Sequence, residues 1–406
     1  MPRAGVTTTM ATVAPEYYLV GSTDRDAVSY TVGEEIVFDV RYTRDGEDTM
    51  PCPLFAWKLR GDDGAVCEGE TSGASGHVTV RTSLAKAGFV RLTVNACGAD
   101  GKPLPGVIPF EGGACAEIAS VAQAGGEPAD FDAFWKRTIE SELDTTEPVF
   151  LMKEEFRCGD PGDIVYDIRV ACPGPAAVSG YLRMPRNAAP GSLPIRVSYR
   201  GYGVRSAELP AKATAISVSL NQQGSENGHP GEYYDRLRAE KYEGWGFGEQ
   251  ENQSPDTCDF KYLLLRALQA IRAAKTLPEW DGKNITVLGG SMGAFQAMFA
   301  AAMEPAVTAA DICIPWMCDL EAPAKLGRLR GWRPADAPAL PYYDTVNLAK
   351  RVRCPVRISA GLGDDTCPPS GAVALYRALP GEKSLTLLQG RTHHYILPGG
   401  AKSTVK

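Results

Sequence analysis

The chain has 406 residues, a length that suits two domains better than one. Its 44% hydrophobic and 22% charged residues are typical of a folded globular protein, and its net charge of −7 argues against nucleic-acid or anionic-membrane partners. No apolar run approaches the roughly 18 residues of a membrane span, and the first residues lack the apolar core of a secretory signal. We therefore expect a cytoplasmic protein, unless a secretion signal was trimmed from the sequence.

The cysteines and histidines do not form a metal-binding pattern. The 11 cysteines are spread without CxxC pairs or zinc-type spacing, which favours reduced thiols. The chain has only 4 histidines: His77, His229, His393 and His394. We expect no metal site.

Residues 1–122 predict a small all-β sandwich of the immunoglobulin-like kind. The runs "EEIVFDVRY", "LFAWKLRG" and "GFVRLTVNA" alternate apolar and polar residues with a period of two. Turn-rich stretches such as "RDGED" and "GDDG" separate them, as in an antiparallel sandwich. "AQAGGEP" then reads as a linker. We expect this accessory domain to shape access or assembly without contributing to chemistry.

Residues 123–406 predict a mostly parallel sheet covered by helices on both faces. The segment "PADFDAFWKRTIESEL" places Phe131, Phe134, Trp135 and Ile139 on one helical face. Strands then alternate with helices. "LPIRVSYRGYG", "NITVLGG" and "CPVRISAGLGDD" are strand candidates, and "FKYLLLRALQAIRAAKTL" and "SMGAFQAMFAAAM" are helix candidates.

One strand-to-helix junction has the pattern of a nucleophile elbow. Gly289-Gly290-Ser291-Met292-Gly293 fits G-x-S-x-G, with a buried strand before it and a helix after it. Glycines at Gly289, Gly290 and Gly293 allow the serine to take a strained conformation while the helix passes close to the strand. A tight turn without catalytic function is the alternative, and the flanking elements argue against it.

The residues after Ser291 supply the partners that a serine nucleophile needs. The hydrolase order Ser…Asp/Glu…His leaves His393 and His394 as candidate bases. Asp364 and Asp365 follow a β run, at the carboxyl edge expected to carry the serine. The order predicts a Ser-His-Asp triad, with either aspartate and either histidine as its member.

Five segments make the sequence resemble the acetyl xylan esterase/cephalosporin C deacetylase family, carbohydrate esterase family seven of the α/β-hydrolase superfamily. They are "PADFDAFW", "GYGVRS", "LPEWDGKNITVLGGSMG", "YYDTVNLAKRVRCPVRISAGLGDDTCPPS" and "THHYILP", and the resemblance covers about residues 125 to 400. It implies an α/β-hydrolase fold, with Ser291 as nucleophile, Asp364 as acid and His393 as base. It also implies that the backbone amides of Tyr202 and Met292 form the oxyanion hole.

The sequence departs from that family near the substrate. Met292 stands where the family usually has glutamine, and Arg200 begins the segment that is H-G-Y in the family. "NQQG" replaces R-G-Q-G, so Gln223 is the corresponding substrate-binding candidate. Trp316 is either a ring face for a sugar or an ordinary core residue.

The resemblance implies an esterase that removes acetyl groups from carbohydrate hydroxyls or from other small acetate esters, without a cofactor. Family members are often ring-shaped, so we expect a homo-oligomer. Two alternatives remain open. The chain could be a non-catalytic carbohydrate-binding or interaction protein on a hydrolase scaffold, or a peptidase of the same fold.

Overall fold

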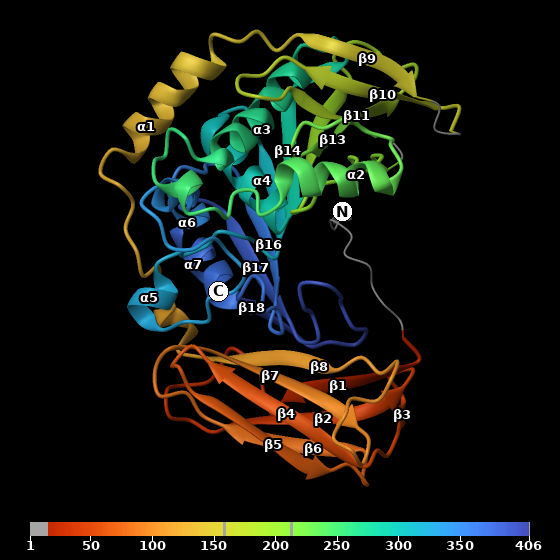
Figure 1. Ribbon diagram of the computed structural model, residues 1–406, viewed down its shortest axis with the longest axis vertical. Helices are drawn as coiled ribbons and strands as arrows, with labels where there is room; N and C mark the ends of the chain where they lie inside the picture. The colour runs from red at the N-terminus through yellow and green to blue at the C-terminus, as the bar shows by residue number, and fades with distance from the viewer. Residues whose placement is uncertain (1–14, 157–159, 212–213, 406) are drawn as a thin grey trace.

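The computed structural model describes residues 15–156, 160–211 and 214–405. Two antiparallel β-sheets lie at one end of the molecule, below a larger sheet with its helices (Figure 1). The first small sheet contains β1 (Tyr17–Thr23), β2 (Ile36–Arg44), β3 (Asp48–Thr49) and β6 (His77–Thr82). The second has the order β5 (Val66–Ser72), β4 (Leu54–Gly61), β7 (Gly88–Cys97) and β8 (Phe110–Ala116).

The two small sheets share one apolar core. Alternate residues of β2 are buried, and Phe38 of this strand packs in the same cluster as Phe55 of β4 and Leu92 of β7. This is the packing that a period-two pattern produces when two sheets face each other. The three runs predicted as strands correspond to β2, β4 and β7.

The large sheet has ten strands, and its middle is parallel. Its order is β18 (Lys402–Val405), β17 (Lys383–Leu388), β16 (Val356–Gly361), β15 (Ala309–Cys313), β14 (Trp280–Gly290), β12 (Leu193–Tyr199), β13 (Ile216–Asn221), β11 (Val178–Pro185), β10 (Asp163–Val170) and β9 (Phe150–Phe156). The strands from β17 to β13 in this order pair in parallel, and the outer strands pair antiparallel. The prediction of a mostly parallel sheet is confirmed.

Seven α-helices accompany this sheet within the described residues: α1 (Phe131–Thr138), α2 (Gly231–Leu237), α3 (Asp259–Lys275), α4 (Met292–Met303), α5 (Ala322–Leu326), α6 (Thr345–Ala349) and α7 (Pro369–Ala378). Single turns of 3₁₀-helix are η1 (Ile118–Ser120), η4 (Gln250–Asn252) and η5 (Leu340–Tyr343), and π-helical turns are η2 (Ile139–Leu143) and η3 (Arg238–Tyr242). No helix in the described ranges is long and apolar enough to cross a membrane.

The helices that cover the parallel strands contact one another in the order α3, α4, α6, α7. Most of α3, which the sequence predicts as a helix, is buried, with Leu264, Leu268 and Ile271 in the core. Beneath them, the inward residues of β12 include Ile195 and Val197. Because strand side chains alternate, the intervening residues of β12 point to the opposite face of the sheet. Two of those residues, Arg196 and Ser198, are polar, and both line a cavity.

Candidate active site

Ser291 lies between β14 and α4 in a backbone conformation that few residues adopt. Its φ is 56° and its ψ is −123°. Such a conformation costs on the order of 1–3 kcal/mol in a non-glycine residue and persists only where its surroundings enforce it. Here the Ser291 amide donates to the Cys313 carbonyl of β15 at 3.1 Å, and the Ser291 carbonyl accepts from the Ala294 amide at 2.9 Å. The turn is therefore fixed on both sides by backbone hydrogen bonds.

Two glycines allow this turn because α4 passes directly against the strands. A Cβ atom on Gly293 would lie 2.1 Å from the Tyr199 carbonyl oxygen of β12. A Cβ atom on Gly289 would lie 2.2 Å from the Gly293 backbone. Neither contact is possible, so both positions require glycine. A Cβ on Gly290 would meet the Cys313 sulfur at 3.0 Å, a tight contact with a side chain.

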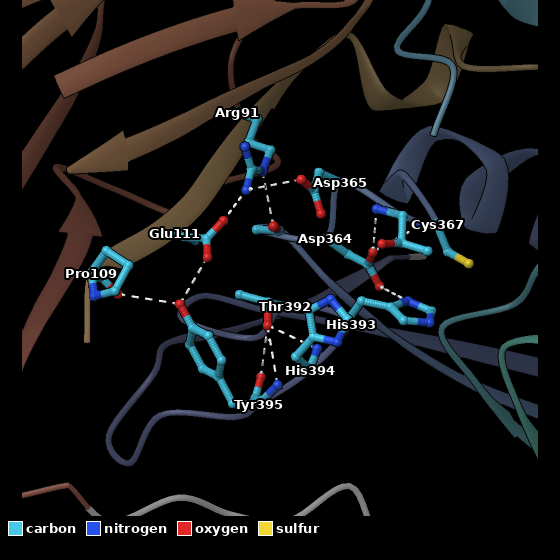
Figure 2. A network of polar contacts seen from close by, with 12 residues as sticks. Arg91, Pro109, Glu111, Asp364, Asp365, Cys367, Thr392, His393, His394 and Tyr395 are labelled. Carbon is cyan, nitrogen blue, oxygen red and sulfur yellow. Dashed lines mark hydrogen bonds and ion pairs between the residues drawn. The ribbon is translucent and has the colours of Figure 1, made fainter. Parts of the chain in front are cut away.

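His393 and Asp364 are in direct contact. His393 lies in the loop after β17, and its Nδ1 is 3.1 Å from Oδ2 of Asp364, in the loop after β16 (Figure 2). Asp364 is fully buried, and its Oδ1 accepts hydrogen bonds from the amides of Thr366 at 2.9 Å and Cys367 at 2.7 Å. These contacts orient the carboxylate toward the imidazole.

The alternative triad members, Asp365 and His394, make other contacts. Asp365 has a side chain 55% exposed, and its Oδ2 lies 3.8 Å from Nη2 of Arg91 in the sandwich. The His394 amide donates to Thr392 Oγ1 at 3.0 Å, and its ring lies edge-on to that of His393, with centroids 5.6 Å apart. The geometry thus pairs His393 with Asp364.

A cavity of about 1030 Å³ brings the serine and both histidines together. Ser291, His393 and His394 all border it. Arg196 and Ser198 of β12, paired in register with Ser217 and Ser219 of β13, line it along the sheet. The cavity therefore has a polar wall of strand side chains that leads to the serine.

The backbone near both predicted oxyanion-hole residues lies close to Ser291. Met292 is the first residue of α4, whose N-terminus concentrates partial positive charge. Tyr202 follows β12 and lines the cavity. The backbone beside it is close to the serine, because a Cβ on Gly201 would lie 3.8 Å from the Ser291 Cβ. These positions could offer backbone amides to a developing negative charge next to Ser291.

Two of the substrate-binding candidates do not border this cavity. Gln223 is 3% exposed and follows β13, where its amide donates to Asn221 Oδ1 at 3.1 Å. Trp316 is 2% exposed, and its Nε1 donates to the Trp332 carbonyl at 2.6 Å. Of the two roles open to Trp316, the geometry favours the core.

The sequence analysis missed Trp332, a tryptophan that does line the cavity. Trp332 is 39% exposed, and its ring centroid lies 4.8 Å from that of Tyr202 and 4.3 Å from that of Phe247. The signal was present in "RLRGWRP", where a large aromatic residue stands among charged and turn-forming residues. Neighbours of this kind favour an exposed position for the tryptophan.

The same cavity contains charged side chains, of which only Arg200 was noted from the sequence, as a departure from the family's H-G-Y segment. Arg200 and Arg205 border it together with Glu208, whose Oε1 is 3.3 Å from Arg200 Nη2. Burial, with Arg205 nearby, lowers the pKa of Arg200 to about 10. Arg200 thus remains a cation at neutral pH.

Cys367, whose amide donates to Asp364, carries a thiol that is a second potential nucleophile at this site. Burial raises the pKa of this thiol well above its usual value. Because the thiolate is the reactive form, Cys367 stays unreactive near neutral pH. Within the described ranges, no group of three or more His, Cys, Asp and Glu side chains could hold a metal ion.

Comparison with known proteins identifies a family from sequence similarity and a fold from structural similarity. A family model described as acetyl xylan esterase (AXE1) matches residues 116–330 and 337–405. The acetyl esterase Axe7A of Xylanibacter ruminicola is 28% identical over 272 residues, which are 63% of this chain and 61% of the relative. The matched part thus spans less than two thirds of that relative's length.

Two solved structures have a similar fold. The acetyl xylan esterase from Paenibacillus sp. R4 is 21% identical, with a TM-score of 0.55 over 68% of this chain and 93% of that chain. Acetyl xylan esterase 1 from Thermoanaerobacterium sp. JW/SL YS485 is also 21% identical, with a TM-score of 0.54 over 68% of this chain and 92% of that chain.

The parallel sheet, the strained serine after β14 and these structural likenesses define the fold as that of an α/β-hydrolase, as the sequence predicts. Because the family model matches more than half of the residues, the chain belongs to the acetyl xylan esterase family. Two parts with described structure lie outside the match: strands β1 to β7 with most of β8, and residues 331–336, which include Trp332.

Proposed function

We propose that the protein is a serine esterase that removes acetyl groups from carbohydrate hydroxyls, with Ser291, His393 and Asp364 as its catalytic triad. The proposal is carried by one contact together with one shared cavity. Ser291 and His393 border the same cavity, and the far nitrogen of His393 is held by a fully buried carboxylate. Membership of the acetyl xylan esterase family supports the reaction type.

The first half of the reaction acylates the serine. His393 Nε2 accepts the proton of Ser291 Oγ as this oxygen attacks the acetyl carbonyl carbon. The amides of Tyr202 and Met292 donate to the resulting oxyanion. His393 then gives the proton to the departing sugar oxygen, and the acetyl group remains on Ser291.

The second half releases acetate. Water takes the place of the sugar, and His393 removes a proton from it as the water oxygen attacks the acetyl-enzyme. Collapse of the second tetrahedral intermediate breaks the Ser291–acetyl bond and returns the proton to Oγ. Asp364 stabilises the imidazolium in both halves and keeps Nδ1 protonated in the neutral ring.

Carbohydrate is the substrate class that best fits the cavity. Sugars present hydroxyls to be hydrogen-bonded and an apolar ring face to be stacked. Arg196, Ser198 and Ser219 offer donors along the wall, and the exposed Trp332 ring offers a flat apolar surface. The names of the similar proteins, acetyl esterase and acetyl xylan esterase, agree with this class.

The test combines labelling and turnover in the full chain. A serine-reactive phosphonate should add one adduct by intact mass, and peptide mapping should locate it at Ser291. Acetate release from an aryl acetate and from acetylated xylo-oligosaccharide should accompany it. Adduct formation elsewhere, or no acetate release, would favour a non-catalytic binding protein. Cleavage of a short peptide amide without ester turnover would favour a peptidase.

A further inference from the structure

The β-sandwich touches both loops that carry the partners of Ser291. These contacts come from two neighbouring strands, β7 and β8, and they end on the loops after β16 and β17 (Figure 2). Both strands lie mostly or entirely outside the part of the chain that matches the family model. This arrangement goes beyond the expected role of the sandwich in access or assembly.

Arg91 of β7 holds the residues on both sides of Asp364. Its Nε donates to the Gly363 carbonyl at 2.9 Å, and its Nη2 lies 3.8 Å from Asp365 Oδ2. The same Nη2 also forms an ion pair with Glu111 of β8. The Arg91 and Glu111 side chains are only 12% and 18% exposed, so solvent screens their pairing weakly.

Glu111 holds the loop that contains His393. Its Oε1 accepts a hydrogen bond of 2.8 Å from the Tyr395 hydroxyl. Burial raises the pKa of Tyr395 to about 12, so this hydroxyl keeps its proton. Tyr395 closes a tight turn with Thr392, whose amide donates to the Tyr395 carbonyl at 2.9 Å and whose Oγ1 accepts from the Tyr395 amide at 3.1 Å. His393 lies within that turn.

The backbones also meet at this point. A Cβ on Gly363 would lie 2.3 Å from the Glu111 carbonyl oxygen, and one on Gly113 would lie 2.8 Å from the Leu362 carbonyl oxygen. The Gln389 side chain accepts from the Gly113 amide at 3.0 Å and donates to the Gly113 carbonyl at 2.6 Å. Strand β8 is therefore fitted against both loops with little room for adjustment.

We propose that Arg91 and Glu111 are positioning residues of the esterase, which hold the Asp364 and His393 loops at the separation that their hydrogen bond requires. The proposal rests on the triad of the proposed function. The buried ion pair connects the two loops. Arg91 fixes the loop that carries Asp364, and Glu111, through Tyr395, fixes the loop that carries His393. Loosening the ion pair would leave Ser291 in place and misalign its base, and small misplacements of catalytic groups lower the rate strongly.

The experiment measures kcat, KM and the pH dependence of aryl acetate turnover for Arg91→Met, Glu111→Gln and Tyr395→Phe in the full chain. We expect kcat to fall about ten- to a hundred-fold in Arg91→Met, and less in the other two, with KM changed by less than about threefold. The acidic limb of the kcat/KM profile should move to lower pH, because a weaker carboxylate contact stabilises the imidazolium less. Tyr395→Phe removes one oxygen atom and keeps the test valid if Arg91→Met does not fold.

Asp62→Asn is the matched control for damage to the same interface. Asp62 is a buried acidic residue of the sandwich, and its Oδ1 accepts from the Leu329 amide and its Oδ2 from the Phe89 amide, each at 2.9 Å, so neither of these hydrogen bonds ends on the loops of Asp364 and His393. We expect Asp62→Asn to leave kcat and the position of the acidic limb of the pH profile unchanged. A loss of kcat in Asp62→Asn equal to that in the three variants would overturn the positioning role. So would an unchanged kcat together with an unmoved acidic limb of the pH profile in all three variants. Absence of both ester turnover and Ser291 labelling in the unchanged protein would instead refute the proposed function.

Discussion

The edge of the sheet that carries Ser291 and the wall of the cavity beyond it are built in different ways. At the edge, main-chain hydrogen bonds and glycines fix each element, as between Ser291 and Cys313 or between Gly293 and Tyr199. Along the wall, side chains from separate segments meet, such as Arg196 of β12 and Trp332 of an irregular segment. The edge leaves little freedom for substitution, whereas we expect substitutions along the wall to change substrate binding more than the chemistry.

Changing the nucleophile should produce the largest loss. Ser291→Ala removes the oxygen that forms the acetyl-enzyme, and the adjacent Cys367 cannot replace it because its buried thiol stays protonated. We expect esterase kcat to fall on the order of 10³-fold or more, with an unchanged thermal unfolding midpoint. Steady-state turnover of an aryl acetate measures the loss. Retention of more than about a tenth of the wild-type rate would end the triad proposal.

The two adjacent histidines, His393 and His394, allow the catalytic edge and the cavity wall to be compared within a single loop. Both border the cavity, but the imidazole in contact with Asp364 belongs to His393. His393→Ala should therefore lose activity about as severely as Ser291→Ala, because triad members act as a unit. His394→Ala should cost roughly tenfold or less, through loop packing or substrate contact.

Turnover and phosphonate labelling should rank the two histidine variants in the same way. An inactive His394→Ala together with an active His393→Ala would move the base by one residue. It would also show that the family alignment through Tyr395 is out of register.

The parts that local sequence determines were predictable. A strand, G-x-S-x-G and a helix together specify the Ser291 turn, and loops at the carboxyl ends of parallel strands necessarily meet at one edge. The place of the tryptophans was only partly predictable in this way. Trp316 stands in the largely apolar run "CIPWMC" and is buried, and Trp332 stands in "RLRGWRP" and is 39% exposed. That Trp332 lines the cavity depends on tertiary packing, which no local pattern contains. The bridge through Arg91 and Glu111 joins residues more than 250 positions from the loops they hold, beyond the reach of any local pattern.

The smallest effect, and the one most specific to the cavity wall, should come from Trp332. Its ring packs against Tyr202 and Phe247 and remains partly exposed, and the residue lines the cavity, so the ring can stack on a sugar. An aromatic contact of this kind is worth about 0.5–1.5 kcal/mol, which corresponds to a two- to twelve-fold change in affinity. Trp332→Ala should accordingly raise KM for acetylated xylo-oligosaccharide by that factor.

The matched comparison uses Trp332→Phe and a substrate without a sugar. Trp332→Phe keeps a ring face and should recover most of the affinity, while KM for a small aryl acetate should stay within about twofold in both variants. Equal losses on both substrates would mean that the residue supports Tyr202, and through it the oxyanion hole, instead of contacting carbohydrate. Since residues 331–336 lie outside the family match, a sugar-specific loss would identify a determinant that this chain adds to the shared catalytic edge.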